Sequence, residues 1–399
     1  MFEPKTAKSA KSGGSSRGTG EFVEGRARLI LPPHVGGKSG VFFNPKMGMN
    51  RDIAMLFALS HFFPSRQLRV CDPMTASGVR AVRYVLETSN VLHVLASDSE
   101  SNPVETARRT VDLNGLAGRI SVVQSEANLL LLNHVTERFD LVDLDPFGSP
   151  APYFENTLRA TLDGGVIAAT ATDMGPLTGA RAPACIRRYG VRPVRSEFEK
   201  EMAIRILAGC LVMIGGKLEL GVEIAFSHAS DHYARIYGKV SKGRRSANLS
   251  AKSLGFLEYC PECLRRNTQT KLESVRTSCV DCGGSVRVGG PIWLGSIWDP
   301  QTVQGMIDHT PGLQSSRLSE IQNILTCIGE EQTSSPFHYR TDAFSKRLGC
   351  RPPALKQVLA TLQEAGFDAT RTHFSPSGFR TNAPCRDIAS IFQALTKEL

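Results

Sequence analysis

From about residue 68 onward, short apolar runs alternate with stretches in which apolar residues recur every three or four positions. The runs predict strands over 68–71, 91–96, 120–123, 139–144 and 165–170, and the periodic stretches predict helices over 79–88, 105–114 and 153–162. Strands that alternate with helices are typical of a parallel sheet covered on both faces. The pattern therefore predicts a Rossmann-like α/β domain whose ligands lie beyond the carboxyl ends of its strands.

The pattern changes after about residue 255. The segment 259–287 is polar, carries cysteines and lacks long periodic runs. Farther on, 318–327, 341–348 and 354–364 predict helices, and 369–374 and 378–381 predict a hairpin. Helices followed by a hairpin indicate a smaller α+β domain of winged-helix-like type. The predicted order is a flexible tail at 1–20, the α/β domain at 21–255, a four-cysteine module at 256–290 and a C-terminal domain at 291–399.

Composition narrows the class of partner. Lys and Arg total 47 against 38 Asp and Glu, which gives a formal charge of +9 and indicates an anionic partner, most often nucleic acid. No secretory segment and no apolar stretch long enough for a membrane is present, so we expect no membrane association. Ten cysteines are too sparse for a disulfide scaffold. We therefore expect an intracellular protein, cytoplasmic or, in a eukaryote, nuclear or organellar, with no obligate protein partner.

Four cysteines have the spacing of a metal site. Cys260-x-x-Cys263 is followed after fifteen residues by Cys279-x-x-Cys282. Two such knuckles supply the four thiolates of a tetrahedral Zn²⁺ site, and a site without an open coordination position is structural. The alternative is a chance grouping of free cysteines. The spacing therefore predicts a zinc ribbon inserted between the two larger domains.

The fourth predicted strand ends in an unusual turn, Asp145-Pro146-Phe147-Gly148. A carboxylate accepts hydrogen bonds from an exocyclic amine, and an aromatic ring stacks on a flat heterocycle. The turn therefore predicts a pocket that holds a nucleobase by its amino group, with Phe42 opposing Phe147 across the base. The alternative is a turn whose aspartate only caps the next helix.

The earlier strand ends indicate a nucleoside cofactor. The loop 72–78 is built of small residues, but it lacks both the glycine fingerprint of dinucleotide folds and a P-loop lysine. S-adenosylmethionine, which has no pyrophosphate, fits this loop better. In that case Asp98 would bind the ribose hydroxyls, Glu126 and Ala127 would lie along the adenine, and Arg51 would pair with the methionine carboxylate. Helix capping is the alternative for the acids, and an ordinary surface arginine is the alternative for Arg51.

Four motifs together resemble the tRNA (guanine-26 N2)-dimethyltransferase family. They are Phe-Phe-Asn-Pro-Lys-Met-x-x-Asn-Arg-Asp from Phe42, Asp-Leu-Asp-Pro-Phe-Gly-Ser-Pro from Asp143, Ala-Thr-Ala-Thr-Asp-Met-x-Pro-Leu from Ala169 and Thr-Arg-Thr-His-Phe-Ser-Pro-Ser-Gly from Thr370. The resemblance runs from about residue 41 to 384. It implies a class I methyltransferase fold and transfer of one or two methyl groups from S-adenosylmethionine to the exocyclic amine of guanosine 26 in tRNA.

The resemblance also assigns roles to individual residues. It implies that Asp145 is catalytic, that Phe42 and Phe147 stack the target base, that the cofactor is bound by Arg51, Arg80, Asp98, Glu126 and Ala127, and that Asp72 lies near the cofactor. Glu126 stands where relatives often have aspartate, and Lys46 replaces a frequent arginine. Relatives that keep the four cysteines include enzymes that also modify position 27, so that position stays open, as does the choice of mono- or dimethyl product.

Basic residues outside these motifs are candidates for the tRNA backbone. They form a stretch at Arg181, Arg187, Arg188, Arg192 and Arg195, and a group on the predicted hairpin at Arg371, His373 and Arg380. A solvated helix face is the alternative for the stretch. Two other functions remain open at this point, namely a methyltransferase acting on DNA adenine or cytosine, and a non-enzymatic regulator with a degenerate methyltransferase fold.

Overall fold

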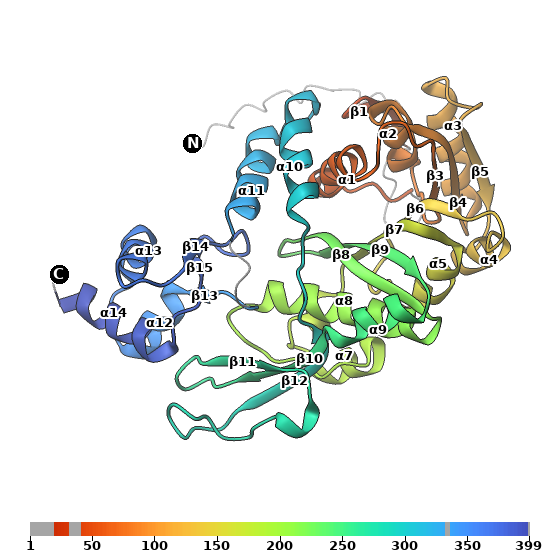
Figure 1. Ribbon diagram of the computed structural model, residues 1–399. Coiled ribbons are helices and arrows are strands. Elements are labelled where there is room, and N and C mark those ends of the chain that lie inside the picture. The colour runs from red at the N-terminus through yellow and green to blue at the C-terminus, as the bar shows by residue number, and fades with distance from the viewer. Residues whose placement is uncertain (1–19, 32–40, 332–335, 398–399) are drawn as a thin grey trace, which may run out of the picture.

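The computed structural model describes residues 20–31, 41–331 and 336–397, so almost all of the predicted tail lies outside the described residues. A seven-stranded sheet, ordered β5-β4-β3-β6-β7-β9-β8, forms the centre of the larger domain (Figure 1). The first five strands in sequence are β3 (Leu68–Asp72), β4 (Val91–Asp98), β5 (Ile120–Gln124), β6 (Phe139–Leu144) and β7 (Thr161–Ala171), all parallel. The predicted parallel sheet is confirmed for these strands.

A hairpin that the sequence analysis did not predict completes the sheet. It consists of β8 (Leu220–Ala229) and β9 (Ala234–Lys242), and β9 runs antiparallel beside β7, with Ala168 opposite Tyr237. The sheet is therefore mixed. Its middle strand β6 is buried at every position, so it carries apolar residues on both faces, and its two aspartates, Asp140 and Asp143, are paired with arginines.

Helices cover both faces of this sheet (Figure 1). The helices of this domain are α1 (Gly48–His61), α2 (Val79–Glu87), α3 (Ser101–Leu113), α4 (Ala127–Asn133), α5 (Phe154–Ala160), α6 (Met174–Leu177), α7 (Ala182–Tyr189), α8 (Glu199–Lys217) and α9 (Arg244–Lys252), of which α6 and α7 pack on α8. The helix predicted over 153–162 ends earlier, because Thr161 already pairs with Phe139 as part of β7. At the N-terminal side, β1 (Gly20–Glu24) and β2 (Ala27–Leu31) form a hairpin, and β2 packs on α2 and α3.

The cysteine module is a small antiparallel sheet packed on α8. Its strands are β10 (Leu254–Tyr259), β11 (Arg266–Gln269) and β12 (Arg287–Trp293), in the order β11-β10-β12. The helix comes so close to β12 that a Cβ at Gly209 would lie 3.0 Å from the amide nitrogen of Trp293. Glycine at this position therefore lets the module dock directly on the α/β domain.

The C-terminal part has the element order of a winged helix. It contains α10 (Pro300–His309), α11 (Leu318–Glu330), β13 (Tyr339–Arg340), α12 (Thr341–Leu348), α13 (Leu355–Glu364), β14 (Ala369–Arg371), β15 (Gly378–Thr381) and α14 (Cys385–Lys397). Its sheet has the order β13-β15-β14, and the predicted hairpin is present, with Ala369 opposite Thr381. The first strand of the hairpin is shorter than predicted. None of the helices among the described residues is long and apolar enough to cross a bilayer.

Candidate active site and zinc cluster

Four acidic residues lie at one edge of the sheet because their strands are parallel neighbours. Asp72 ends β3, Asp98 ends β4, and Asp145 directly follows β6, whereas Glu126 lies two residues beyond β5. This is the edge at which open α/β sheets bind ligands. Each of these acids stands at or just after a strand end predicted from the sequence, and the strand order brings the four to one edge.

Asp145 is anchored by a buried arginine. Its Oδ2 accepts a hydrogen bond from Arg80 Nη2 at 2.5 Å, and its side chain is 22% exposed. Burial alone would raise the pKa of Asp145, but the positive charges of Arg80 and Arg235 hold that pKa below its ordinary value. The carboxylate is therefore charged at neutral pH. It is partly exposed, and Arg80 fixes its orientation.

Two exposed phenylalanines contact each other at this turn, namely Phe147, two residues after Asp145, and Phe42, which comes from a distant part of the chain. The rings of Phe42 and Phe147 meet edge to face, with centroids 4.6 Å apart and planes at 80°. They are 51% and 76% exposed, which is unusual for large apolar side chains. Gly148 turns the chain with a φ of +82°, a conformation that is unfavourable for residues other than glycine. The two rings predicted to face each other across a base thus contact each other directly.

The loop after β3 is held in a conformation that few residues adopt. Ala76 has a φ of +46°, and Gly78, which immediately precedes α2, has a φ of +76°. A Cβ added to Gly78 would lie 3.1 Å from the Cα atom of Ala107, so glycine also fits this close approach. Asp98 Oδ2 accepts a hydrogen bond from the Ala76 amide at 3.2 Å, which ties this loop to the end of β4. Burial raises the pKa of Asp72 to about 7, although Arg80 opposes the shift.

Glu126 and Ala127 begin the helix that follows β5. The Oε2 atom of Glu126 caps α4 by accepting a hydrogen bond from the Leu129 amide at 3.0 Å. The capping interaction named as the alternative is therefore present, and it coexists with exposure of the Glu126 side chain at the acidic edge. Ala127 is buried at the first turn of the helix.

Arg51 is not an ordinary surface arginine. It is 5% exposed, and its Nε and Nη2 atoms donate to the two carboxylate oxygens of Glu24 at 2.6 and 2.5 Å. Nη2 also donates to the Asn44 carbonyl at 3.1 Å. The N-terminal hairpin thus fixes the arginine that the sequence assigned to the methionine carboxylate, and Arg51 in turn fixes the segment that carries Phe42.

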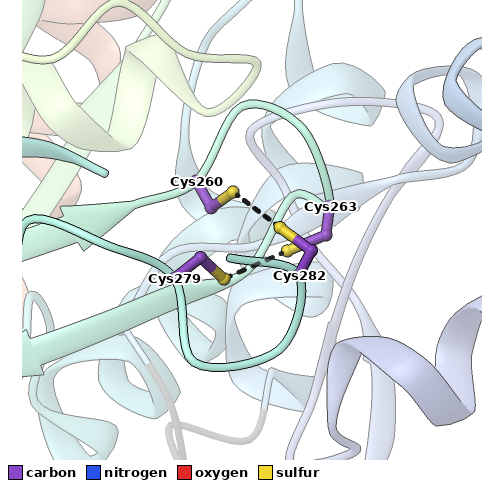
Figure 2. A group of neighbouring side chains, drawn as sticks. All are labelled: Cys260, Cys263, Cys279 and Cys282. Carbon is purple, nitrogen blue, oxygen red and sulfur yellow. Dashed lines mark hydrogen bonds between the residues drawn. The ribbon is translucent and has the colours of Figure 1, made fainter. Parts of the chain in front are cut away.

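The four predicted zinc ligands converge (Figure 2). The Sγ atoms of Cys260, Cys263, Cys279 and Cys282 all lie within 4.8 Å of one another. Two of the pairs are 3.5 Å apart, and a tetrahedral Zn²⁺ site with bonds of about 2.3 Å has sulfur atoms about 3.8 Å apart. The cluster therefore fits a structural Zn²⁺ held by four thiolates. Gly283, with a φ of +73°, closes the second knuckle by donating to the Cys279 carbonyl.

Replacing one of these ligands tests the structural role of the metal. In Cys260→Ser we expect loss of about one equivalent of zinc and a lower unfolding temperature, because the module has little apolar core of its own. Zinc is measured by elemental analysis after dialysis and unfolding by calorimetry. Cys350→Ser, at a half-buried cysteine outside the cluster, is the control. A folded Cys260→Ser protein with unchanged thermal stability would contradict the structural role.

The predicted phosphate-binding residues fall into two groups. The arginines of the basic stretch are exposed on and beside α7, and Arg188 donates to Asp173 at 2.8 Å. Arg371 is exposed at the end of β14. These side chains are available to a polyanion.

Arg380 and His373 belong to a different environment, and here the structure corrects the sequence analysis. Arg380 is 3% exposed and pairs with Glu201 of α8 at 3.1 Å and with Glu331 at 2.6 Å, and His373 Nδ1 also contacts Glu331. Both side chains lie inside the contact between the C-terminal part and α8. They are thus committed to carboxylates, which leaves them unsuited to contact the tRNA backbone.

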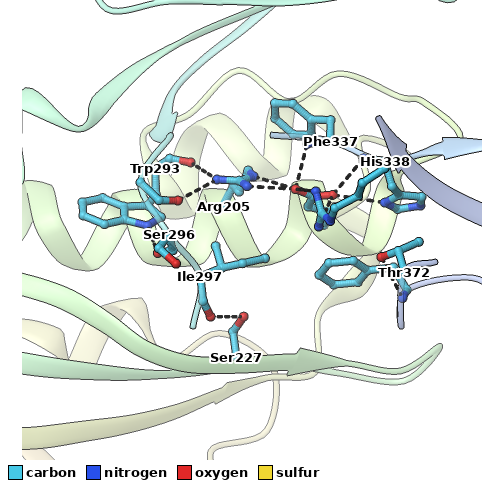
Figure 3. A network of polar contacts seen from close by, with 12 residues as sticks. Arg205, Ser227, Trp293, Ser296, Ile297, Phe337, His338 and Thr372 are labelled. Carbon is cyan, nitrogen blue, oxygen red and sulfur yellow. Dashed lines mark hydrogen bonds and ion pairs between the residues drawn. The ribbon is translucent and has the colours of Figure 1, made fainter. Parts of the chain in front are cut away.

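Figure 3 shows the rest of this network. Arg205 donates to Glu201 and to the carbonyls of Trp293 and Gly295, and Glu201 accepts hydrogen bonds from the amides of Phe337 and His338. Glu201 and its partner Arg205 therefore join the α/β domain, the strand β12 and the C-terminal part.

The strand order of the sheet, the acidic edge and the carboxylate–proline–aromatic turn together define an S-adenosylmethionine-dependent methyltransferase of the class I fold. The family model "N2,N2-dimethylguanosine tRNA methyltransferase" matches residues 22–393. The chain therefore belongs to this family of tRNA methyltransferases, as its motifs indicated.

Known relatives agree over nearly the whole chain. A tRNA (guanine(26)-N(2))-dimethyltransferase of Methanobrevibacter smithii is 34% identical, over 94% of this chain and 97% of the relative. A tRNA (guanine(26)-N(2)/guanine(27)-N(2))-dimethyltransferase of Aquifex aeolicus is 32% identical over 93% and 95%. The solved structure of Trm1 from Pyrococcus horikoshii with S-adenosyl-L-methionine superposes with a TM-score of 0.83 at 30% identity, over 93% of this chain and 99% of that one.

Proposed function

We propose that this protein transfers one or two methyl groups from S-adenosylmethionine to the exocyclic N2 atom of guanosine 26 in tRNA. Family membership supports the reaction, and the observation that carries the site is the pairing of an oriented Asp145 with the Phe42–Phe147 contact at the acidic edge. A regulator with a degenerate fold would not need to keep this constellation. A DNA methyltransferase is disfavoured because the family match extends through the C-terminal part.

Asp145 is proposed to act on the nucleophile. The lone pair of the guanine amine is delocalised into the ring, so the amine attacks poorly unless its geometry changes. Because Oδ2 is bound to Arg80, Oδ1 is the oxygen that accepts an N–H of the amine. This hydrogen bond draws the lone pair out of conjugation and stabilises the positive charge that develops on nitrogen. A carboxylate with a lowered pKa is a weak base, so the proton leaves late, to Asp145 or to water beside it.

The aromatic pair is proposed to hold the target base outside the tRNA stack. A base between Phe42 and Phe147 would gain about 1–3 kcal/mol from stacking. This gain offsets part of the cost of unstacking the nucleotide, which is a few kcal/mol. The second methylation needs the monomethyl product to stay between the same two rings.

The cofactor pocket is proposed along the acidic edge. Asp98 would bind the ribose, Glu126 and Ala127 would lie along the adenine, Asp72 would lie near by, and Arg51 would pair with the methionine carboxylate. The donor set fits, because it offers acids for hydroxyls and a fixed arginine for a carboxylate. Bound S-adenosylmethionine supplies an electrophilic methyl group, and the protein contributes alignment, which can be worth about 7–11 kcal/mol.

The tRNA backbone is proposed to contact α7 and the C-terminal part. Arg181, Arg187 and Arg188 on and beside α7 and Arg371 at the end of β14 are exposed, and the excess of basic residues over the whole chain favours a polyanion. Such contacts neutralise phosphates without reading sequence, so the choice of position 26 would depend on tRNA shape. A tRNA-modifying role also favours an intracellular location.

An assay with defined tRNAs tests the reaction. We expect labelled S-adenosylmethionine and an unmodified transcript with G26 to yield N2-methylated guanosine, identified by nucleoside analysis. A transcript with inosine at position 26 is the control, because inosine differs from guanosine only by lacking the 2-amino group. A transcript with A26 and G27 reports on position 27. Equal labelling of the G26 and inosine transcripts would exclude the proposed acceptor.

A further inference from the structure

A chain of alternating charges leads from Asp145 into the interior. Arg80 Nη2 contacts Asp145 Oδ2 at 2.5 Å, Arg80 Nη1 contacts Asp143 Oδ2 at 3.1 Å, and Arg235 Nη2 donates to both Asp143 oxygens at 2.8 Å. The side chains of Arg80, Asp143 and Arg235 are 4%, 0% and 0% exposed, against 22% for Asp145. The outer end of this charge chain is therefore the most open to a ligand.

The inner members are fixed from several directions. Arg80 Nη2 also donates to Asn50 Oδ1 at 3.0 Å, Tyr84 Oη donates to Asp143 Oδ2 at 2.7 Å, and Arg235 donates to Thr170 Oγ1 at 2.6 Å. These partners come from α1, α2 and β7, which lie around the same edge of the sheet. A guanidinium held by several acceptors has little freedom to turn. Arg80 therefore presents a fixed donor to Asp145.

We propose that Arg80 is a positioning residue, which holds Asp145 with one oxygen toward the interior and the other toward the guanine amine, while Asp143 and Arg235 hold Arg80. This inference rests on the proposed function and deepens it. It is additional to the cofactor role that the sequence resemblance implied for Arg80. Arg80 is 4% exposed, about as little as Arg51, and donates to Asp145, Asp143 and Asn50, so its hold on Asp145 does not depend on a bound cofactor.

The charge balance gives a physical reason for the arrangement. Two aspartates and two arginines sum to zero, so the interior holds no net charge from this chain. Without Arg80, the carboxylates of Asp143 and Asp145 would share one arginine. Burial and mutual repulsion would then favour the protonated form of Asp145, which is a weaker acceptor for an N–H group.

Several other groups act on the charge of Asp145, and a pH test has to allow for them. Arg80 and Tyr84 lie on α2, Asp72 on β3, Asp143 on β6, and Arg235 and Tyr237 on β9, with Tyr233 just before β9. The tyrosines have raised pKa values through burial and stay neutral. Burial raises the pKa of Asp72 to about 7, so Asp72 is the neighbour that titrates near neutrality.

Two variants separate positioning from folding. Arg80→Lys keeps the positive charge, but an ammonium group lacks the planar set of donors with which the guanidinium binds Asp145, Asp143 and Asn50 together. The double variant Arg80→Met with Asp143→Asn removes one charge of each sign, so Arg235 and Asp145 still balance. Arg66→Lys and the double variant Arg66→Met with Asp140→Asn are matched controls. Arg66 contacts Asp140 at 2.5 Å, and Asp140 lies on β6, as Asp143 does, but near the opposite end of that strand.

The readouts are kcat at saturating S-adenosylmethionine and tRNA from pH 5 to 8, and the Kd of S-adenosylmethionine measured without tRNA. We expect wild type and the controls to show no acid limb in kcat that reflects Asp145, whose pKa lies below this range. In the Arg80 double variant we expect kcat to fall about 100-fold and an acid limb to appear near pH 5, since an arginine neighbour lowers a carboxyl pKa by about one to three units. In Arg80→Lys we expect a smaller fall in kcat and the same dependence of kcat on pH as in wild type.

Two results would overturn the inference. One is a double variant whose kcat stays within threefold of wild type with an unchanged pH profile. The other is a loss confined to the Kd of S-adenosylmethionine, with kcat at saturation unchanged, which would make Arg80 a cofactor ligand. Wild-type protein that fails to methylate tRNA would overturn the proposed function itself, and this inference with it, so the two failures are distinguishable.

Discussion

Asp145→Ala is expected to abolish methyl transfer, with a loss of at least about 1,000-fold in kcat, because the guanine amine loses the acceptor that draws out its lone pair. The fold should survive the change. Arg80 keeps Asp143 and Asn50 as partners, so no buried charge is left alone. Affinity for tRNA should stay within a few-fold of wild type, because phosphate contacts dominate it. Single-turnover methylation and filter binding measure the two quantities.

Asp145→Asn sharpens this test. The amide keeps the shape of the carboxylate and one acceptor oxygen, but it loses the negative charge that opposes the developing ammonium charge. We expect activity between wild type and Asp145→Ala. Asp112→Ala, at an exposed aspartate on α3, is the control for removing an acidic residue. Near-normal turnover by Asp145→Ala would exclude the proposed role.

Arg380→Met is expected to lower the free energy of unfolding by about 3–5 kcal/mol, the usual cost of removing one partner from a buried ion pair. Glu201 and Glu331 would lose a shared partner inside the contact between α8 and the C-terminal part. Arg371→Met is a matched control, because Arg371 is exposed on the neighbouring strand β14. Urea unfolding followed by fluorescence measures the difference.

The same ion pairs predict a dependence on pH. Burial would raise the pKa of Glu331, but His373 and Arg380 lower it to about 2 from an ordinary value of 4.5. A lowered carboxyl pKa contributes stability that is fully present above the ordinary value and is lost as the pH falls from 4.5 toward 2. Arg380→Met should therefore lose less stability over this interval than wild type. Equal losses in the two proteins would show that Arg380 does not stabilise the charge of Glu331.

Local signals in the sequence predicted the site where short segments determine geometry. The spacing of Cys260, Cys263, Cys279 and Cys282 led directly to the cluster, because each pair forms its own knuckle. The acidic edge followed from the strand ends, since parallel strands align their carboxyl ends. The contact of Phe42 with Phe147 followed from motifs, although the two residues are far apart in the chain.

Interactions between distant buried charges could not be predicted in this way. Asp143 and Arg235 are 92 positions apart, and Glu201 and Arg380 are 179 apart. Neither periodicity nor spacing links such residues, and an arginine reads as a surface residue unless its partner is known. For this reason Arg380 and His373 were assigned to phosphate, whereas the structure buries them. The hairpin β8–β9 was missed although Val222, Ile224 and Phe226 alternate along β8 and are all buried.

The edge-to-face contact of Phe42 and Phe147 has a consequence for the order of events in each turnover. Their centroids are 4.6 Å apart, whereas a flat purine between two parallel rings needs about 7 Å, twice a van der Waals spacing of about 3.5 Å. With the proposed stacking of the target base, one ring must turn and the two rings must separate before the nucleotide enters. Each ring covers part of the other in this structure, and a purine bound as proposed would replace that contact with one aromatic face against each ring.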